Sequence, residues 1–163
     1  MAETLAVTDL LPNKFEPKRK FRWIFAIEGI DSFLIKKAAR PTFTISNQEI
    51  KYINSIRYLA GRQVWDEISL DLYDPIAPSG AQQVMEWIRT HYESVSGRAG
   101  YADFYKRDIQ CKLLDPIGTV IELWDIKGAF LTKATFGDLD YDDDKTPVTI
   151  ALSLRYDNAV LQF

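Results

Sequence analysis

The sequence predicts a mainly β (α+β) protein, an antiparallel β-sandwich or barrel with one α-helix packed against it. Three segments, 21–27, 67–72 and 148–154, alternate apolar and polar residues with the period of two that half-buried strands show. One segment, 80–91, instead spaces its apolar residues as an amphipathic helix does. A turn signal at 115–118 separates two further strand-like runs and predicts a hairpin, which is an antiparallel pair.

Residues 1–20 are expected to form an N-terminal arm ahead of the folded part of the chain. They mix acidic residues, prolines and a basic cluster at 18–20 without clear periodicity. Residues 21–163 are expected to form a single domain, because 163 residues are enough for one core and few for two.

Two strands and a long hairpin are expected after the arm. The segment 21–27 is rich in aromatic and β-branched residues and stops at Gly29, and a second strand at 33–39 ends before Pro41. From residue 42 to residue 65, apolar residues recur among polar ones, which predicts a long hairpin. Its apolar content exceeds what a solvated loop needs, so this hairpin is a candidate partner surface.

The strand at 67–72 and the closing strand at 148–154 each present one apolar face and one polar face. The apolar positions are Ile68, Leu70, Leu72, Val148, Ile150, Leu152 and Leu154. The polar or small positions are Glu67, Ser69, Asp71, Thr149, Ala151 and Ser153. One face of each strand therefore needs a core, and the other tolerates water.

The predicted helix begins after Ser79. Ser79 followed by Gln82 fits a capping box, in which the serine hydroxyl accepts a hydrogen bond from a backbone amide of the first turn. The helix is expected to end near Tyr92. Its stripe at helical spacing, which we expect to lie against a sheet, consists of Val84, Trp87, Ile88 and His91.

A second hairpin is expected from a strand at 108–114, the turn Asp115-Pro116-Ile117-Gly118 and a strand from 119 to about 127. Cys111 falls on the apolar face of the first of these strands. It is the single cysteine of the chain, so no intrachain disulfide is possible. A buried structural thiol is the preferred interpretation, and a nucleophile is the alternative.

Composition and charge limit the function. Hydrophobic residues make up 47% of the chain and charged residues 26%, which is typical of a folded globular protein. A formal net charge of −3 argues against a broad basic face that grips nucleic acid. The N-terminal residues lack a secretory pattern, and no apolar run approaches the length that spans a membrane, so we expect a protein made in the cytoplasm that does not bind membranes.

No motif indicates an enzyme, a metal or a cofactor, and we expect none of the three. The acidic patch of Asp138, Asp140 and 142–144 contains the D-x-D-x-D spacing of a calcium loop, but the glycine and glutamate that such a loop needs are missing in either register. A solvated acidic turn is the preferred interpretation. His91 is the single histidine, and its place at the end of the predicted helix favours a structural or surface role.

The order of several short motifs over residues 21–156 resembles the tail tube protein family of contractile-tailed bacteriophages. The motifs are Ala60-Gly61-Arg62, Trp65-Asp66, Tyr73-Asp74, the short helix with Trp87, Ile126-Lys127-Gly128-Ala129-Phe130, Phe136-Gly137-Asp138-Leu139-Asp140-Tyr141 and Arg155-Tyr156-Asp157. The resemblance implies a tail-tube-like β-sandwich or barrel related in fold to the haemolysin-coregulated tube protein of type VI secretion.

The resemblance also implies an assembly and its partners. Homo-hexameric rings would stack into a hollow tube inside a contractile sheath, with baseplate and tail terminator proteins at its ends. The tape measure protein and DNA would pass through the lumen, and the genome would leave by it during ejection. The protein would be assembled in the host cytoplasm and found in the virion, as part of the phage tail.

Two groups of residues become candidates under this hypothesis. The candidates for ring stacking and contacts between subunits lie in the predicted hairpin: Ile45, Ile50, Tyr52, Ile53, Ile56, Arg57, Tyr58 and Arg62. The candidates for the lumen lining are Glu67, Ser69, Asp71, Thr149 and Ser153. An acidic or neutral lining would repel phosphates and let DNA slide, and Arg155 departs from that expectation if it faces the lumen.

Other functions stay open from the sequence. A baseplate tube initiator and a type VI secretion tube protein are close variants of the tube hypothesis. A monomeric β-barrel that binds a small ligand in its interior belongs to a different class. A hydrolase that uses a metal held by the Asp138 to Asp144 patch is a third possibility, which the failed calcium-loop register makes the weakest.

Overall fold

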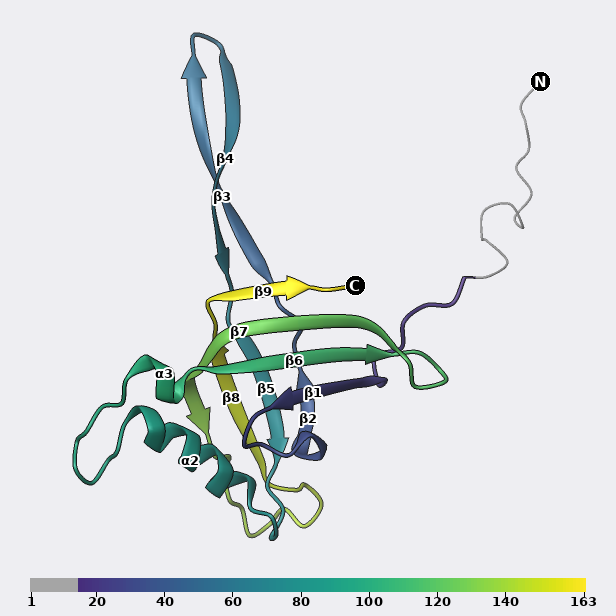
Figure 1. Cartoon of the computed structure of the whole chain (residues 1–163), viewed down its shortest axis with the longest axis vertical. Coiled ribbons are helices and arrows are strands. Elements are labelled where there is room, and N and C mark those ends of the chain that lie inside the picture. The colour runs from purple at the N-terminus through teal and green to yellow at the C-terminus, as the bar shows by residue number, and fades with distance from the viewer. Residues whose placement is uncertain (1–14) are drawn as a thin grey trace.

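The computed structural model describes residues 15–163, in which seven strands form one bent antiparallel sheet and a two-stranded hairpin projects from it (Figure 1). The elements are β1 (Trp23–Ile27), the 3-10 turn η1 (Ser32–Leu34), β2 (Ile35–Ala38), β3 (Phe43–Tyr52), β4 (Ser55–Trp65), β5 (Ile68–Tyr73), α2 (Gly80–His91), α3 (Ala102–Tyr105), β6 (Arg107–Leu114), β7 (Val120–Thr135), β8 (Thr149–Arg155) and β9 (Asn158–Leu161). The expected mainly β fold with one principal helix is confirmed. The proposed arm at residues 1–20 falls mostly outside the described residues.

Strand β7 folds the sheet into two layers. Residues 120–129 pair with β6, whereas residues 130–135 pair with β8, so the sheet order runs β1-β6-β7-β8-β5-β2. Strand β9 adds to the first layer by pairing with residues 124–127 of β7. Figure 1 shows the strands of the first layer crossing over those of the second, as in a sandwich.

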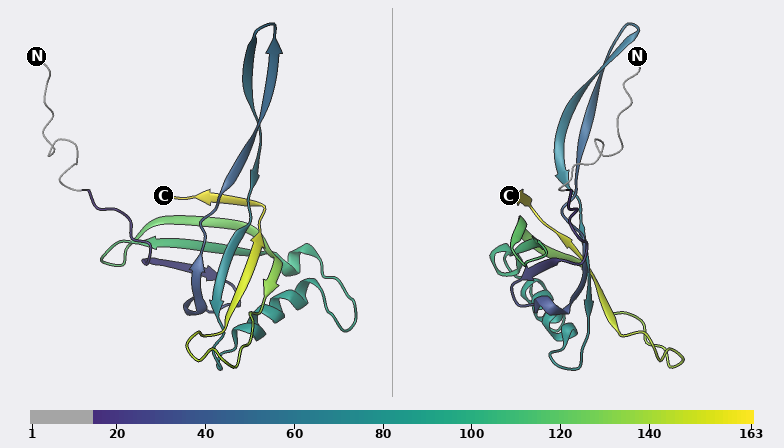
Figure 2. Two further views of the ribbon diagram at one scale, coloured as in Figure 1. Left: turned by 180° about the vertical axis from the view of Figure 1, so that it is seen from behind. Right: turned by 90° about the vertical axis from the view of Figure 1, so that its right-hand side faces the viewer.

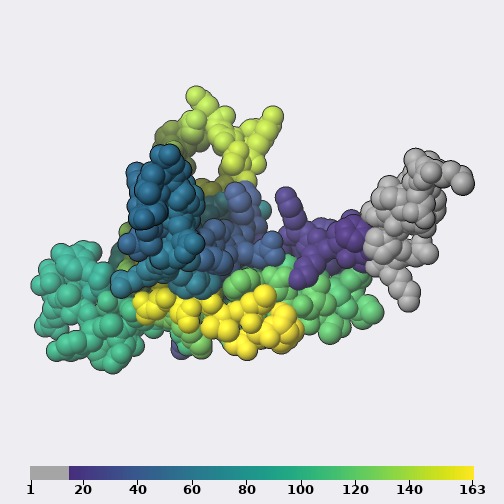
Figure 3. All heavy atoms as spheres, turned by 90° about the horizontal axis from the view of Figure 1, so that it is seen from above, coloured from purple at the N-terminus to yellow at the C-terminus, as the bar shows by residue number. Residues whose placement is uncertain are grey.

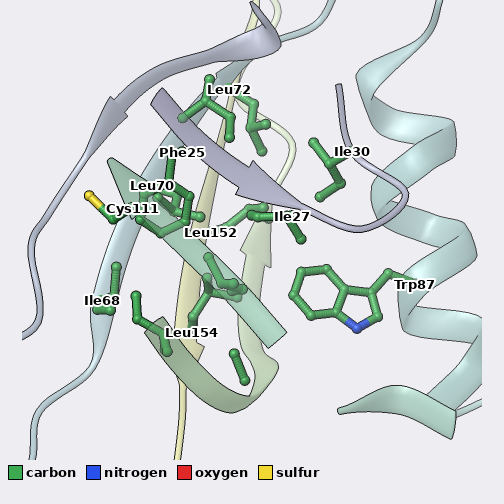
Figure 4. Close-up of a cluster of buried hydrophobic side chains, with 14 of the residues drawn as sticks. Phe25, Ile27, Ile30, Ile68, Leu70, Leu72, Trp87, Cys111, Leu152 and Leu154 are labelled. Atoms are coloured by element: carbon green, nitrogen blue, oxygen red, sulfur yellow. The ribbon is translucent and has the colours of Figure 1, made fainter. Parts of the chain in front are cut away.

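The core lies between the two layers. Its side chains come from alternate positions of β1, β6 and β7 on one side and of β5 and β8 on the other, as a period of two requires. Figure 4 shows this cluster, which includes Phe25, Ile27, Ile68, Leu70, Leu72, Cys111, Leu152 and Leu154. The predicted inward faces of the strands at 67–72 and 148–154 are confirmed except at Val148, which precedes β8 and is 37% exposed.

Helix α2 packs on the sandwich through the buried side chains of Val84 and Trp87. Its predicted cap is confirmed, because the Ser79 hydroxyl accepts a hydrogen bond from the Gln82 amide at 3.4 Å. The Trp87 ring points toward the core (Figure 4), and its Nε1 donates to the Tyr105 carbonyl at 2.7 Å. Ile88 is half-buried and His91 is exposed, so the buried stripe is narrower than predicted.

The bounds of two expected strands differ in the structure, and one further strand was not expected. The strand expected at 33–39 is the 3-10 turn η1 followed by β2, which spans only Ile35–Ala38. The strand that begins near residue 119 continues to Thr135 instead of ending near Lys127, because Gly128, at φ 66°, bends the strand without ending its pairing. The short strand β9 was not predicted, because its first residue, Asn158, and the preceding Asp157 have the composition of a turn. No helix among residues 15–163 is long and apolar enough to span a bilayer.

Candidate assembly surface

The β3–β4 hairpin extends away from the sandwich and is exposed along its length (Figures 1 and 2). Every residue of the two strands is exposed except Trp65, which is half-buried. The large apolar side chains on this exposed hairpin are Phe43, Ile45, Ile50, Tyr52, Ile53, Ile56, Tyr58, Leu59 and Val64. Apolar residues gathered in this way on a folded protein mark a surface that another molecule covers.

A two-residue turn closes the hairpin. Tyr52 pairs with Ser55, and the Ser55 hydroxyl donates to the Tyr52 carbonyl at 3.2 Å. The first turn residue, Ile53, has φ 53° and is 86% exposed. Glycine, asparagine or aspartate normally takes such a position, because a β-branched side chain is strained at positive φ. A strained apolar residue at the tip of an exposed hairpin is typical of a contact residue.

A β-bulge interrupts the hairpin one third of the way along. Ile45 pairs with Gln63 but Asn47 pairs with Ala60, so Ser46 lies opposite both Gly61 and Arg62. A Cβ added at Gly61 would lie 2.3 Å from the Ser46 hydroxyl oxygen, so the two strands approach this closely because residue 61 is glycine. Bulges of this kind increase the local twist and redirect the strand.

Apolar side chains occupy both faces of the hairpin. Paired residues share a face and alternate residues of one strand do too, which assigns every candidate except Ile53 in the turn and Arg62 in the bulge. One face carries Ile45, Ile56 and Tyr58. The other carries Ile50, Tyr52, Arg57 and Leu59. Apolar side chains on both faces of the hairpin are therefore left in water in the isolated chain.

Three aromatic rings fix the base of the hairpin to the sandwich. The Trp65 ring contacts the Phe43 ring edge-on at a centroid distance of 5.4 Å and the Tyr156 ring at 5.7 Å. Tyr156 is buried, and its hydroxyl donates to the Thr42 carbonyl at 3.3 Å. Burial raises the pKa of this hydroxyl. The sequence contained these aromatics, but their spacing gave no sign that they meet.

The predicted lumen residues lie on one surface of the second layer. Ser69 pairs with Ser153 and Tyr73 pairs with Thr149 across β5 and β8, on the face opposite the buried leucines. Asp71 alternates with Ser69 on the same face, and Glu67 lies just before β5. The structure therefore brings the candidate lining residues together.

The polar face of β2, β5, β8 and the end of β7 is of mixed charge, whereas the residues chosen from the sequence as a lumen lining are acidic or neutral. Lys37 pairs with Asp71, and Lys133 pairs with Ser153. Arg155 alternates with Ser153 along β8 and so stands on this face too. Alternation along β5 and β8 did not place Lys37 and Lys133 on this face, because β2 and β7 supply them. Arg155 is the exception that the sequence had already indicated.

A buried carboxylate lies at the edge of the first layer. Glu122 is 4% exposed, and its side chain accepts hydrogen bonds from Lys18, from Arg40 at 3.3 Å and from the Trp124 ring nitrogen at 2.6 Å. Burial alone would raise the pKa of this carboxyl, but the three donors outweigh burial and hold the pKa below its ordinary range. Through Lys18, this network attaches the segment before β1 to the sandwich.

The residues considered for catalysis do not converge. The Asp138 to Asp144 patch lies on the exposed connection between β7 and β8, and among residues 15–163 no three histidine, cysteine, aspartate or glutamate side chains are placed to hold a metal ion. Cys111 is buried as predicted, and burial raises the pKa of its thiol to about 11, so the thiol is protonated at neutral pH.

Comparisons of sequence find no protein-family model and no curated protein that matches this chain. Comparisons of structure find clear matches. A chain in the cryo-EM structure of the anti-feeding prophage cap, its tube-terminating cap, is 19% identical, with a TM-score of 0.74 over 97% of this chain and 99% of that one. A chain in the sheath–tube complex of the PVC extracellular contractile injection system, in the extended state, is 15% identical, with a TM-score of 0.71 over 98% and 99%.

A type six secretion system protein is a more distant match, 6% identical with a TM-score of 0.52 over 86% of this chain and 82% of that one. At these identities the matches establish the fold alone. The chain has the tail-tube-like fold that its sequence motifs led us to expect.

Proposed function

We propose that this chain is a structural subunit of the tube of a contractile injection apparatus, and that it acts by assembling with copies of itself. The observation that carries the proposal is the β3–β4 hairpin, exposed and apolar on both faces, on a tail-tube-like fold. Copies that place this hairpin between two neighbours would bury both faces at once. Such a subunit has no turnover and needs no cofactor.

In the finer form of the proposal, hexameric rings stack into a hollow tube inside a contractile sheath. The hairpin makes the contacts between subunits, and the polar face with Ser69, Asp71 and Ser153 lines the lumen. Sheath, baseplate and terminator proteins are the partners, and a bacteriophage tail, with a tape measure protein and genome passing through it, is one setting. The mixed charge of that face suits passage of DNA less well than an acidic lining would.

A cap or baseplate component of the same apparatus is the second candidate. It is favoured by the match to a chain of the anti-feeding prophage cap, because the TM-score of that match is 0.74 and that of the sheath–tube match is 0.71. A small-ligand-binding barrel has less support, because side chains such as Phe25, Leu72 and Ile126 fill the space between the two layers.

Electron microscopy of the purified protein at high concentration, with native mass spectrometry in parallel, tests the proposal. We expect rings or hollow tubes. Two variants probe the hairpin faces separately: Ile56→Ser with Tyr58→Ser on one face, and Ile50→Ser with Leu59→Ser on the other.

Both hairpin variants should remain folded monomers, because none of these side chains contributes to the core. Single rings that do not stack into tubes would indicate a cap. A wild-type protein that stays monomeric even when a baseplate is supplied would refute the assembly proposal.

A further inference from the structure

A basic cleft lies between β1 and β2, the two end strands of the bent sheet. Its volume is about 450 Å³. Trp23, Ala38 and Leu113, which pack against the core, form its floor. Its rim consists of Lys18, Arg19, Lys20, Lys36, Lys37 and Arg40. An apolar floor beneath a cationic rim selects an occupant that carries both apolar groups and negative charge.

Part of the rim charge is not neutralised by the described residues. Lys18 and Arg40 share the single carboxylate of Glu122, and Arg19 pairs with Glu16 at 3.3 Å. Lys20, Lys36 and Lys37 form no ion pair with any residue in the 15–163 range. The Lys36 ammonium instead lies 5.3 Å from the centre of the Tyr73 ring. The cleft is therefore strongly positive in a chain whose net charge is −3.

The β7–β8 connection, residues 136–147, has the complementary character. It interleaves acidic residues with Leu139 and Tyr141, whose side chains are almost fully exposed. Asp140 and Asp143 accept hydrogen bonds from amides of the same loop and so fix its shape. The remaining acids, Asp138, Asp142 and Asp144, form no side-chain hydrogen bond or ion pair with a described residue.

The loop and the cleft lie on separate parts of the molecule. Figure 2 shows the loop splayed away from the body, and Figure 3 shows it, in yellow-green, apart from the purple segment that bounds the cleft. A contact between two such unlike surfaces joins copies head to tail, which gives a closed ring or an open filament.

We propose that the basic cleft of one copy receives the 136–147 loop of the next copy. Leu139 and Tyr141 would cover the apolar floor, and the unpaired aspartates would face Lys20 and Lys37 on the rim. This contact rests on the proposed function, since it supplies a second interface of the same assembly besides the hairpin.

Charge reversal tests the contact. Lys20→Glu with Lys37→Glu, and separately Asp142→Lys with Asp144→Lys, should each raise the protein concentration needed for assembly by about tenfold or more, because like charges would then face each other. The chain that carries all four changes should assemble at a concentration close to that of the wild type, because opposite charges would again face each other. Arg89→Glu on α2 is the control and should assemble like the wild type, because Arg89 does not line the cleft.

The outcomes separate this contact from the proposed function. Suppose that the wild type forms tubes. If both reversals leave assembly unchanged, or if the chain with all four changes assembles no better than either double variant, the contact is wrong and the tube proposal stands. If the wild type never assembles, the tube proposal itself fails.

Two further measurements address other occupants of the cleft. Loss of binding to a single-stranded oligonucleotide in the lysine variant, with assembly intact, would overturn the contact and assign the cleft to a polyanion. In a chain that carries Cys111→Ala, Lys37→Cys and Tyr141→Cys, disulfides should form between chains. Disulfides within a single chain would overturn the contact in favour of the loop of the same copy.

Discussion

Ile53 combines two properties that stability alone would not select. It occupies a positive-φ position at the hairpin tip, and its side chain is 86% exposed. Ile53→Gly relieves the backbone strain, which is worth about 1 kcal/mol, while it removes the apolar side chain. We therefore expect the monomer to unfold at an equal or higher urea concentration and the variant to assemble less well than the wild type.

A matched control separates the tip from any exposed isoleucine. Ile117→Ser changes a side chain that is 90% exposed in the β6–β7 turn, and it should leave assembly unaltered. Sedimentation velocity over a concentration series measures both variants. Equal assembly of Ile53→Gly and the wild type would show that the tip makes no contact.

Glu122 makes the stability of the fold depend on pH. Its folded pKa lies below the ordinary value, so the charged carboxylate stabilises the fold above about pH 4.3. This contribution is lost as the pH falls through the folded pKa. We expect Glu122→Gln to lower stability at neutral pH and to flatten the decline in acid, as measured by urea unfolding between about pH 3 and pH 7.

The exposed Glu67→Gln is the control for the Glu122 substitution, since Glu67 forms no ion pair with another residue among 15–163. The stability of Glu67→Gln should fall in acid as steeply as that of the wild type. If the curves of Glu122→Gln and the wild type run parallel over the whole range, the carboxylate does not stabilise the fold in its charged form.

At the scale of elements, Gly128 allows β7 to pair with a strand of each layer. It has φ 66°, and a Cβ there would lie 2.2 Å from a carboxylate oxygen of Asp157, which itself holds Lys106 at 2.7 Å. Gly128→Ala should cost about 2–3 kcal/mol of unfolding free energy, from backbone strain plus the disturbed ion pair. Gly97, at φ 70° with open space around it, isolates the backbone part.

Gly97→Ala should therefore cost only about 1 kcal/mol. Urea unfolding of the two variants gives the difference. Equal costs would mean that the Asp157 carboxylate moves aside freely and that β7 tolerates a side chain at its corner.

The elements that the sequence predicted well are those whose environment repeats along the strand. Alternation located β5 and β8 because one face of each is buried over its whole length, and a cap located α2 because Ser79 acts locally. The second half of β7 was missed because its partner changes from β6 to β8, a change that no local pattern records.

The candidate site divides in the same way. The hairpin was predictable, since an apolar excess in a turn-rich segment such as 42–65 is visible in the sequence. Its two-faced character depends on the register and on the bulge at Gly61, which pairing alone defines. The basic cleft was not predictable, because Lys20 precedes β1 and Lys37 lies on β2, and these strands are at opposite ends of the sheet order.

At the scale of the whole molecule, the residues that stabilise the fold and the surface proposed for assembly lie on different elements. The core residues come from the seven-stranded sheet, α2 and the turns beside them, whereas β3 and β4 pair only with each other and supply no buried side chain. Hydrophobic stabilisation scales with apolar area removed from water, so most of the hairpin contributes little to the stability of a monomer.

Shortening the hairpin tests this separation. Replacing residues 46–62 by Asn-Gly joins Ile45 to its own partner Gln63 through a two-residue turn and keeps the Phe43, Trp65 and Tyr156 anchor intact. The melting temperature should stay within about 5 °C of that of the wild-type monomer, because no core contact is lost. Rings and tubes should be absent from electron micrographs, because the apolar contacts of both hairpin faces are gone.

Combining the same deletion with Trp65→Ala separates the role of the aromatic base of the hairpin from that of its exposed part. Trp65 packs against the core, so its removal should lower the melting temperature whether or not the hairpin is present. A shortened chain that still forms tubes would transfer the assembly role to the cleft and the 136–147 loop. A shortened chain that no longer folds would mean that the exposed hairpin stabilises the monomer, and the division between folding and assembling surfaces would have to be abandoned.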